Sequence, residues 1–93
     1  MSVSAEPAKP DYAKAYALAM RCFVASGGKQ DQAHARPAFD AAVKLGQAMG
    51  FENARINVDF DWAISRESAK LAKDSTYREA TLATCRKFGW AGN

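Results

Sequence analysis

The sequence predicts an all-helical (all-α) fold, a compact bundle of three to four helices that follows a disordered N-terminal tail. Three observations lead to this fold class. Alanine, the strongest helix former, is abundant throughout the chain. Apolar residues recur every three or four positions within segments that are bounded by capping residues and glycines. Two of the three prolines fall within the first ten residues, so few positions further along interrupt a helix.

The chain has 93 residues, which are enough for one domain and too few for two. Residues 1–10 are small and polar and contain Pro7 and Pro10, so we expect them to form the disordered tail. Residues 11–93 are expected to form the single helical domain. The start of the chain lacks the basic and apolar segments of a signal peptide, and a mature N-terminus behind an added methionine would also fit. No apolar run reaches the roughly 20 residues that span a bilayer.

The first helix is expected to begin after Asp11, a strong N-cap residue, and to end at Gly27 and Gly28. Only Lys14 and Arg21 are charged between these limits, and their spacing of seven places both on one narrow stripe. The rest of the helix surface is apolar or small. Because a helix that is apolar nearly all round is usually central, we expect this one to be the spine of the domain.

The second helix is expected over about residues 37–49, with a short helical turn before it at residues 31–36. Pro37 suits the first turn, where its missing N–H leaves no bond unmade. The expected inner face consists of Phe39, Val43 and Met49. A row of small residues at steps of four would allow another helix to approach closely, and it consists of Ala42, Gly46 and Gly50.

Residues 52–58 are expected to form a turn into the third helix, although residues 54–58 alternate weakly enough to suggest a short strand. The third helix then runs to about Lys73. Three residues are possible N-caps for it, namely Asn57, Asp59 and Asp61. Its expected inner face consists of Phe60, Ile64 and Leu71.

A fourth helix is expected to begin at Thr76, which forms a capping box with Glu79, and a single bent helix is the alternative. Gly89 should end this helix, with Trp90 folding back on its last turn. Its expected inner face consists of Tyr77, Thr81, Cys85 and Phe88.

Cys22 and Cys85 are the two cysteines of the chain, and both fall on helix faces that we expect to be buried. They are interpreted either as one disulfide that ties the last helix to the first or as two separate buried thiols. A disulfide would join the C-terminal parts of two helices, so those helices would run roughly parallel or cross steeply. It would also favour a periplasmic or secreted location slightly over a cytoplasmic one.

No catalytic, cofactor-binding or metal-binding site is predicted, so we expect a protein that is not an enzyme. His34, the single histidine, is interpreted as an exposed residue that Asp31 could orient, with a Cys–His nucleophilic pair as the remote alternative. Asp59 and Asp61 have the spacing of a divalent-metal pair, but their expected role is helix capping. A zinc site would need four ligands gathered from distant positions. Phosphate-cradling and nucleophile-elbow motifs are absent from the sequence.

Positive charge is concentrated in the last third of the chain. Up to Asp61, seven basic and seven acidic residues balance, whereas six basic residues outnumber three acidic ones from Trp62 onward. Four residues at steps of four, three and four form a predicted partner-binding stripe, namely Arg66, Lys70, Lys73 and Tyr77. The structural alternative is an ordinary solvated helix face.

The leading functional hypothesis is therefore a non-enzymatic helical interaction module that binds a protein partner and is exported and disulfide-tied. One alternative is a nucleic-acid-binding domain that uses the same stripe, but a net charge of +3 is small for that class. Another is a small periplasmic stress or chaperone-like protein that exposes apolar surface when conditions change. The sequence predicts no cofactor and leaves the oligomeric state open.

Overall fold

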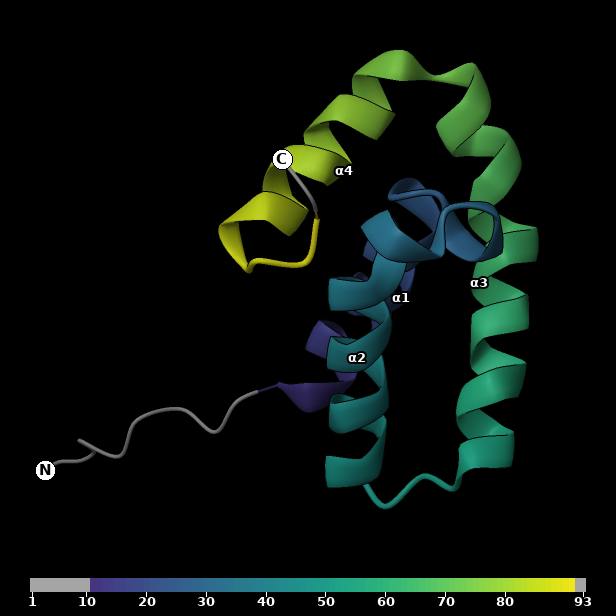
Figure 1. Ribbon diagram of the computed structural model, residues 1–93, viewed down its shortest axis with the longest axis vertical. Helices are drawn as coiled ribbons and strands as arrows, with labels where there is room; N and C mark the ends of the chain where they lie inside the picture. Colours follow the sequence, from purple (N-terminus) through teal and green to yellow (C-terminus); the bar gives the residue numbers. More distant parts are fainter. Residues whose placement is uncertain (1–10, 92–93) are drawn as a thin grey trace, which may run out of the picture.

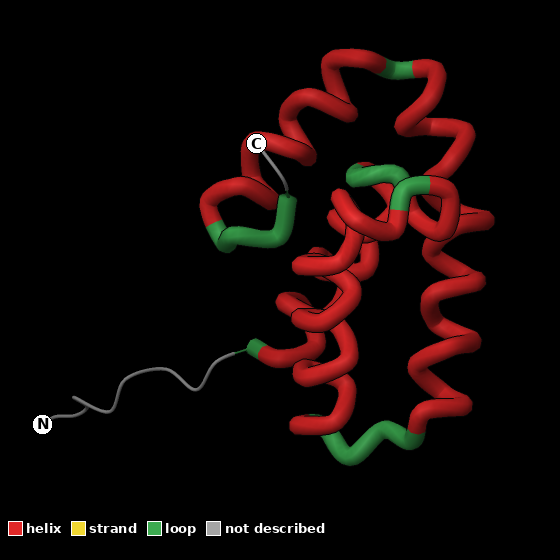
Figure 2. The backbone as a smooth tube through the Cα atoms, viewed as in Figure 1, coloured by secondary structure: helices red, strands yellow, loops and turns green. Residues whose placement is uncertain are grey.

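The computed structural model describes residues 11–91, and the predicted tail of residues 1–10 lies outside this range, as do residues 92–93. The described residues form four α-helices and one short 3-10 helix, without a strand (Figures 1 and 2). This confirms the all-helical class. The elements are α1 (Tyr12–Ala25), η1 (Gly28–Gln30), α2 (Gln32–Ala48), α3 (Asn53–Lys73) and α4 (Ser75–Lys87).

Helix α1 is the spine of the domain, as predicted, because α2, α3 and α4 all pack against it. The Asp11 side chain caps its start by accepting a hydrogen bond from the Lys14 N–H at 3.0 Å. Gly27 and Gly28 follow its end with φ angles of 115° and 57°, which L side chains rarely adopt. Figure 1 shows α2 beside α1, α3 along one side and α4 folded back near the C-terminal end of α1. The buried residues of α1 are Tyr16, Ala19, Met20, Cys22 and Phe23.

Helix α2 begins at Gln32, five residues before the predicted start at Pro37. The Asp31 side chain caps the helix by accepting a hydrogen bond from the His34 N–H at 3.4 Å. The helical turn that was expected to be separate, at residues 31–36, is therefore the start of α2 itself. Pro37 therefore lies inside the helix. The φ angle that its ring fixes is helical, so the helix continues through it at the cost of one lost backbone hydrogen bond and crowding of the preceding turn. The predicted inner face lies at the edge of the core: Phe39 is 37% exposed, but its ring stacks on Phe60 at a centroid distance of 4.9 Å. The buried side consists of Ala35, Ala38, Ala42 and Gly46.

The small-residue row of α2 does provide a close helix contact, but only at Ala42 and Gly46. A Cβ atom added to Gly46 would lie 2.8 Å from Ile56 Cδ1 and 3.0 Å from Tyr16 Cε1, so α1 and α3 both approach this point. Gly50 has open space around it and a φ of 83°, and it ends the helix instead of packing. The Phe51 N–H then donates to the Gly46 carbonyl at 2.9 Å.

Helix α3 begins at Asn53, so the turn and strand interpretations of residues 52–58 are both wrong. Asn57, Asp59 and Asp61 lie inside the helix and do not cap it. The reason is that no glycine or proline interrupts residues 53–73, while apolar residues recur at helical spacing from the start. The end at Lys73 is as predicted. The buried residues are Ile56, Phe60, Ala63, Glu67 and Leu71.

Helix α4 is separate from α3, but Asp74 is its N-cap instead of Thr76. The Asp74 side chain accepts from the Tyr77 N–H at 2.9 Å, and Thr76 lies within the first turn. Thr81 and Cys85 are buried as predicted, whereas Phe88 is 56% exposed and stacks on Trp90. Gly89 closes the helix, and the Trp90 N–H donates to the Cys85 carbonyl at 2.8 Å. None of the helices in residues 11–91 is both long enough and apolar enough to cross a membrane.

Candidate protein-binding surface

A disulfide joins α4 to α1. The sulfur atoms of Cys22 and Cys85 are 2.06 Å apart, their Cα atoms are 5.7 Å apart, and both residues are fully buried. The bond links positions 63 residues apart in the sequence. Because Thr81 and Cys85 are the buried residues of α4, this helix contributes little apolar surface to the core. The covalent bond is therefore a main attachment of α4.

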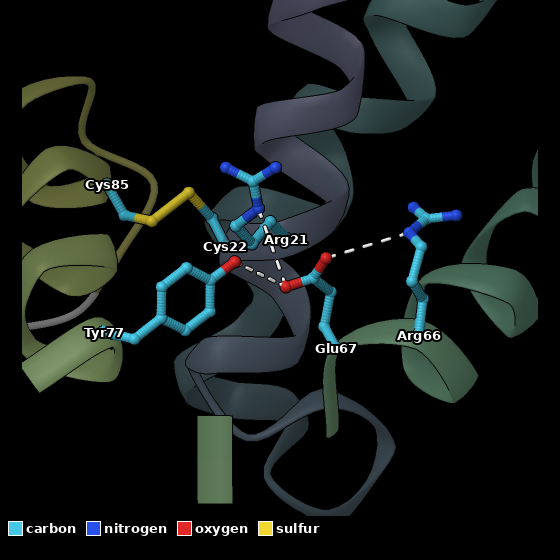
Figure 3. A network of polar contacts seen from close by, with 6 residues as sticks. All are labelled: Arg21, Cys22, Arg66, Glu67, Tyr77 and Cys85. Atoms are coloured by element: carbon cyan, nitrogen blue, oxygen red, sulfur yellow. Dashed lines mark hydrogen bonds and ion pairs between the residues drawn. A yellow bond between two sulfur atoms is a disulfide. The ribbon is translucent and has the colours of Figure 1, made fainter. Parts of the chain in front are cut away.

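A second attachment centres on the buried carboxylate of Glu67, which lies between three helices (Figure 3). The Tyr77 hydroxyl on α4 donates a hydrogen bond to Glu67 Oε1 at 2.7 Å. Nε of Arg21 on α1 is 3.7 Å from the same oxygen, and Nε of Arg66 is 3.7 Å from Oε2. A buried carboxylate is stable only when it is paired and hydrogen-bonded. Burial and the bond to Glu67 both raise the pKa of Tyr77.

The predicted partner-binding stripe divides into two parts in the structure. Arg66, Lys70 and Lys73 are exposed and share one side of α3 at helical spacing. Tyr77 is half-buried, its hydroxyl bonds Glu67, and Lys70 Nζ lies 4.1 Å from the centre of its ring. Tyr77 thus holds α4 against α3, while Arg66, Lys70 and Lys73 remain exposed, although Lys70 also lies over the Tyr77 ring and Arg66 pairs with Glu67.

The most exposed large apolar side chain of the described residues was missed by the sequence reasoning. Trp62, on α3, is 64% exposed, and Val58, one turn earlier, is 51% exposed. Arg66 lies one turn after Trp62, so the three side chains form one stripe, here called the Trp62 face. On α3 the Trp62 face lies on the side of the helix opposite the buried Leu71. The sequence does contain a signal for this exposure. Residues two positions apart point to different sides of a helix, so a helix that buries Phe60 turns Trp62 away from the core.

Two surface hollows flank the Trp62 ring. One is lined by Val58, Asp61 and Ser65 together with Trp62. The other lies toward α1 and is lined by Tyr16, Met20 and Asp59 together with Trp62 and Arg66. The indole ring therefore stands between two concave regions, which a partner surface could fill on both sides.

The remaining candidate residues of the sequence are distributed over separate contacts. His34 is exposed, and its Nδ1 lies 2.8 Å from Asp31 Oδ2, as the sequence suggested. Asp59 accepts from the Tyr16 hydroxyl at 2.7 Å and from Arg55, whereas Asp61 pairs with Lys29 at 3.1 Å. Residues 11–91 contain no group of three or more His, Cys, Asp or Glu side chains that could hold a metal ion.

Comparisons with protein-family models, with curated proteins and with solved structures give no significant match to this chain.

Proposed function

We propose that this protein is a non-enzymatic, disulfide-tied interaction module that binds a protein partner through the Trp62 face. The observation that supports this proposal is the 64% exposure of Trp62 on a regular helix. Individual exposed apolar residues are common, but tryptophan and arginine together are the residue types that dominate binding energy in protein interfaces. In the Trp62 face, Val58 and Arg66 flank the indole ring and extend the contact along α3.

The Trp62 face is held on a rigid support, which favours binding. Ile56, Phe60 and Ala63 anchor the opposite side of α3 in the core, with exposed fractions of 4% or less. A partner would therefore immobilise few additional groups on this protein, and less of the interaction energy would be lost to ordering. The exposed Lys70 and Lys73 continue the surface with positive charge. The complementary partner would offer an apolar pocket with an acidic rim.

The disulfide supports placing this function in an oxidising compartment. Disulfides persist in the periplasm and in secreted proteins, whereas cytosolic thiols are kept reduced. Because the bond between Cys22 and Cys85 is a main attachment of α4, the domain would lose part of its structure under reducing conditions. We therefore propose a periplasmic or secreted site of action.

The test compares Trp62→Ala with Phe88→Ala, a matched control that removes a similarly exposed aromatic ring from another part of the surface. Each variant is immobilised, and proteins retained from an extract of the native compartment are identified and their affinities measured. We expect Trp62→Ala to weaken the partner at least tenfold, because truncating such an anchor costs about 2 kcal/mol or more. Phe88→Ala should bind as the parent does.

Equal binding by the parent and Trp62→Ala would contradict the proposed surface. Trp62→Ala should keep the parent's stability within about 0.5 kcal/mol, so a folding defect would not explain its loss of binding. Phe88→Ala loses its stacking on Trp90, which costs about 0.5–1.5 kcal/mol, and should still bind as the parent does. If the parent instead binds DNA with a steep salt dependence that Trp62→Ala leaves unchanged, the nucleic-acid alternative is supported in place of this proposal.

A further inference from the structure

A groove separate from the Trp62 face runs between the C-terminal end of α1, η1, the C-terminal half of α3 and the first turn of α4. Its volume is about 640 Å³, within the range of small-molecule sites. We call it the α3–α4 groove. Its lining includes Val24, Lys29, Ile64, Leu71, Ala72 and Arg78.

The walls of the α3–α4 groove are mainly apolar, although the polar side chains of Gln30 and Ser68 also line it. Val24 on α1 faces it from one side, and Ile64 and Leu71 on α3 face it from the other. Val24 and Ile64 are partly buried and pack against the main hydrophobic cluster, and Leu71, which is 4% exposed, lies beneath the groove. The surface that Val24 and Ile64 still expose is what an alkyl chain could cover.

The charged side chains of the groove are both cationic. Lys29 and Arg78 line it, and none of the described aspartates or glutamates does. Lys29 Nζ pairs with Asp61 at 3.1 Å and Arg78 Nε lies 3.8 Å from Glu79, but these pairs are exposed. Exposed pairs contribute little energy, so an anionic group could replace either carboxylate. An apolar channel with a cationic edge fits a molecule with the opposite charge at one end of an alkyl chain.

We propose that the α3–α4 groove binds a single-chain amphiphile with an anionic head, of the fatty-acid class. The alkyl chain lies along Val24, Ile64 and Leu71, and the carboxylate lies near Lys29 and Arg78. This site does not depend on the Trp62 face, so the two proposals can fail separately.

The first experiment measures the affinities of octanoate, decanoate and dodecanoate by titration calorimetry, below the concentrations at which they form micelles. Each CH₂ group that enters the groove should tighten binding by up to about fourfold until the groove is filled. Decanoate should bind more tightly than decanol, and decanol more tightly than decyltrimethylammonium. Affinities that are independent of chain length, or equal for the three head groups, would overturn the proposal.

The second experiment locates the site. Ala72→Phe fills the groove from an exposed position, and Ala69→Phe is the control, because Ala69 is exposed on the same helix but outside the groove. Ala72→Phe should weaken decanoate at least tenfold, and Ala69→Phe should bind as the parent does. Melting temperatures close to the parent's will show that both variants fold. Parent-like binding by Ala72→Phe would overturn the assignment.

The third experiment tests the cationic edge. The double variant Lys29→Gln with Arg78→Gln should bind decanoate and decanol equally, whereas Lys44→Gln on α2 should keep the parent's preference for decanoate. A preference that survives the double variant would exclude these residues as the head-group site. A parent protein that binds phosphatidylglycerol vesicles but no monomeric decanoate would also contradict the proposal, since it would indicate a membrane surface as the ligand.

Discussion

The hydroxyl of Tyr77 lies 2.7 Å from Glu67 Oε1, and this hydrogen bond joins α4 to α3 at a residue that is only 8% exposed. Nε of Arg21 is buried beside it at 3.7 Å and has no hydrogen-bond partner within the described residues. The Tyr77 hydroxyl is therefore closer to the buried carboxylate than either of the two arginine Nε atoms beside it.

Tyr77→Phe is expected to reduce the free energy of unfolding by about 1–3 kcal/mol, because a buried charged acceptor then loses its donor. Tyr12→Phe is the control, since Tyr12 is 43% exposed and should contribute little. Urea unfolding of the two variants and the parent gives both values. Equal stability of Tyr77→Phe and the parent would mean that water replaces the lost donor.

Stability should fall as the pH rises above about 10, the ordinary pKa of tyrosine. Burial raises the pKa of Tyr16 and of Tyr77, and the hydrogen bonds to Asp59 and Glu67 raise them further. Below the unfolded-state pKa, both states carry the phenol proton and the full stabilisation is present. Above it, the unfolded state loses its phenol protons first. The free energy of unfolding then falls by at most about 1.4 kcal/mol per pH unit for each tyrosine.

Tyr16 should carry the larger share of this pH dependence, because Tyr77 is less buried and more screened by solvent. Denaturant unfolding across the alkaline range should show a shallower slope for the variant Tyr16→Phe with Tyr77→Phe. The Tyr12→Phe variant should keep the parent's slope. If the double variant follows the parent, other groups cause the alkaline loss.

Gly46→Leu is expected to destabilise the protein by about 1–3 kcal/mol through overpacking, since a Cβ atom alone already meets Ile56 at 2.8 Å. Ala48→Leu on the exposed side of the same helix should have little effect. The pair Gly46→Ala and Ile56→Val tests part of the contact, because valine lacks the Cδ1 atom that the new Cβ meets at 2.8 Å but keeps the γ carbon that it meets at 2.9 Å. The cost of Ile56→Val should be smaller in the Gly46→Ala background, and additive effects would show that the contact relaxes elsewhere.

Loss of the disulfide should reduce stability by up to about 4 kcal/mol in the chain-entropy model, a large part of the stability of a small domain. The change to test is Cys22→Ala with Cys85→Ala. Amide hydrogen exchange should accelerate most in α4, because Thr81 and Cys85 are its buried residues. Intact-mass measurement after alkylation checks the bond itself. Two alkylated cysteines in protein prepared under oxidising conditions would disprove it, and uniform acceleration would contradict the role assigned to α4.

Pro37→Ala is expected to stabilise the protein by about 1–3 kcal/mol. Pro37 is the sixth residue of α2, beyond the first turn, so the Ala33 carbonyl lacks its helical donor and the ring crowds that turn. The greater freedom of the unfolded chain offsets part of the gain. Thermal unfolding measures the balance, and a lower melting temperature would mean that the rigidity of proline matters more than the missing bond.

The sequence by itself determined the helical class, the central position of α1 and the end of α3 at Lys73. The bounds and central position of α1 depend on local chemistry, namely the Asp11 cap, the Gly27–Gly28 turn and a nearly uncharged helix surface. Helix α3 ends at Lys73 because Asp74 caps the next helix. The starts of α2 and α3 were placed too late for a related reason. Pro37 and the aspartates of α3 resemble helix-start signals, but such residues are also tolerated inside a helix that packing stabilises.

Only the tertiary structure decided which residues meet across the helices. Glu67 and Tyr77 are ten residues apart and Tyr16 and Asp59 are 43 apart, and no local pattern specifies that either pair bonds. The exposure of Trp62 and the form of the α3–α4 groove depend on how four helices cross. Crossing geometry follows from side chains that interlock at positions distant in sequence, such as Gly46 against Ile56, and therefore becomes defined only when the chain is folded.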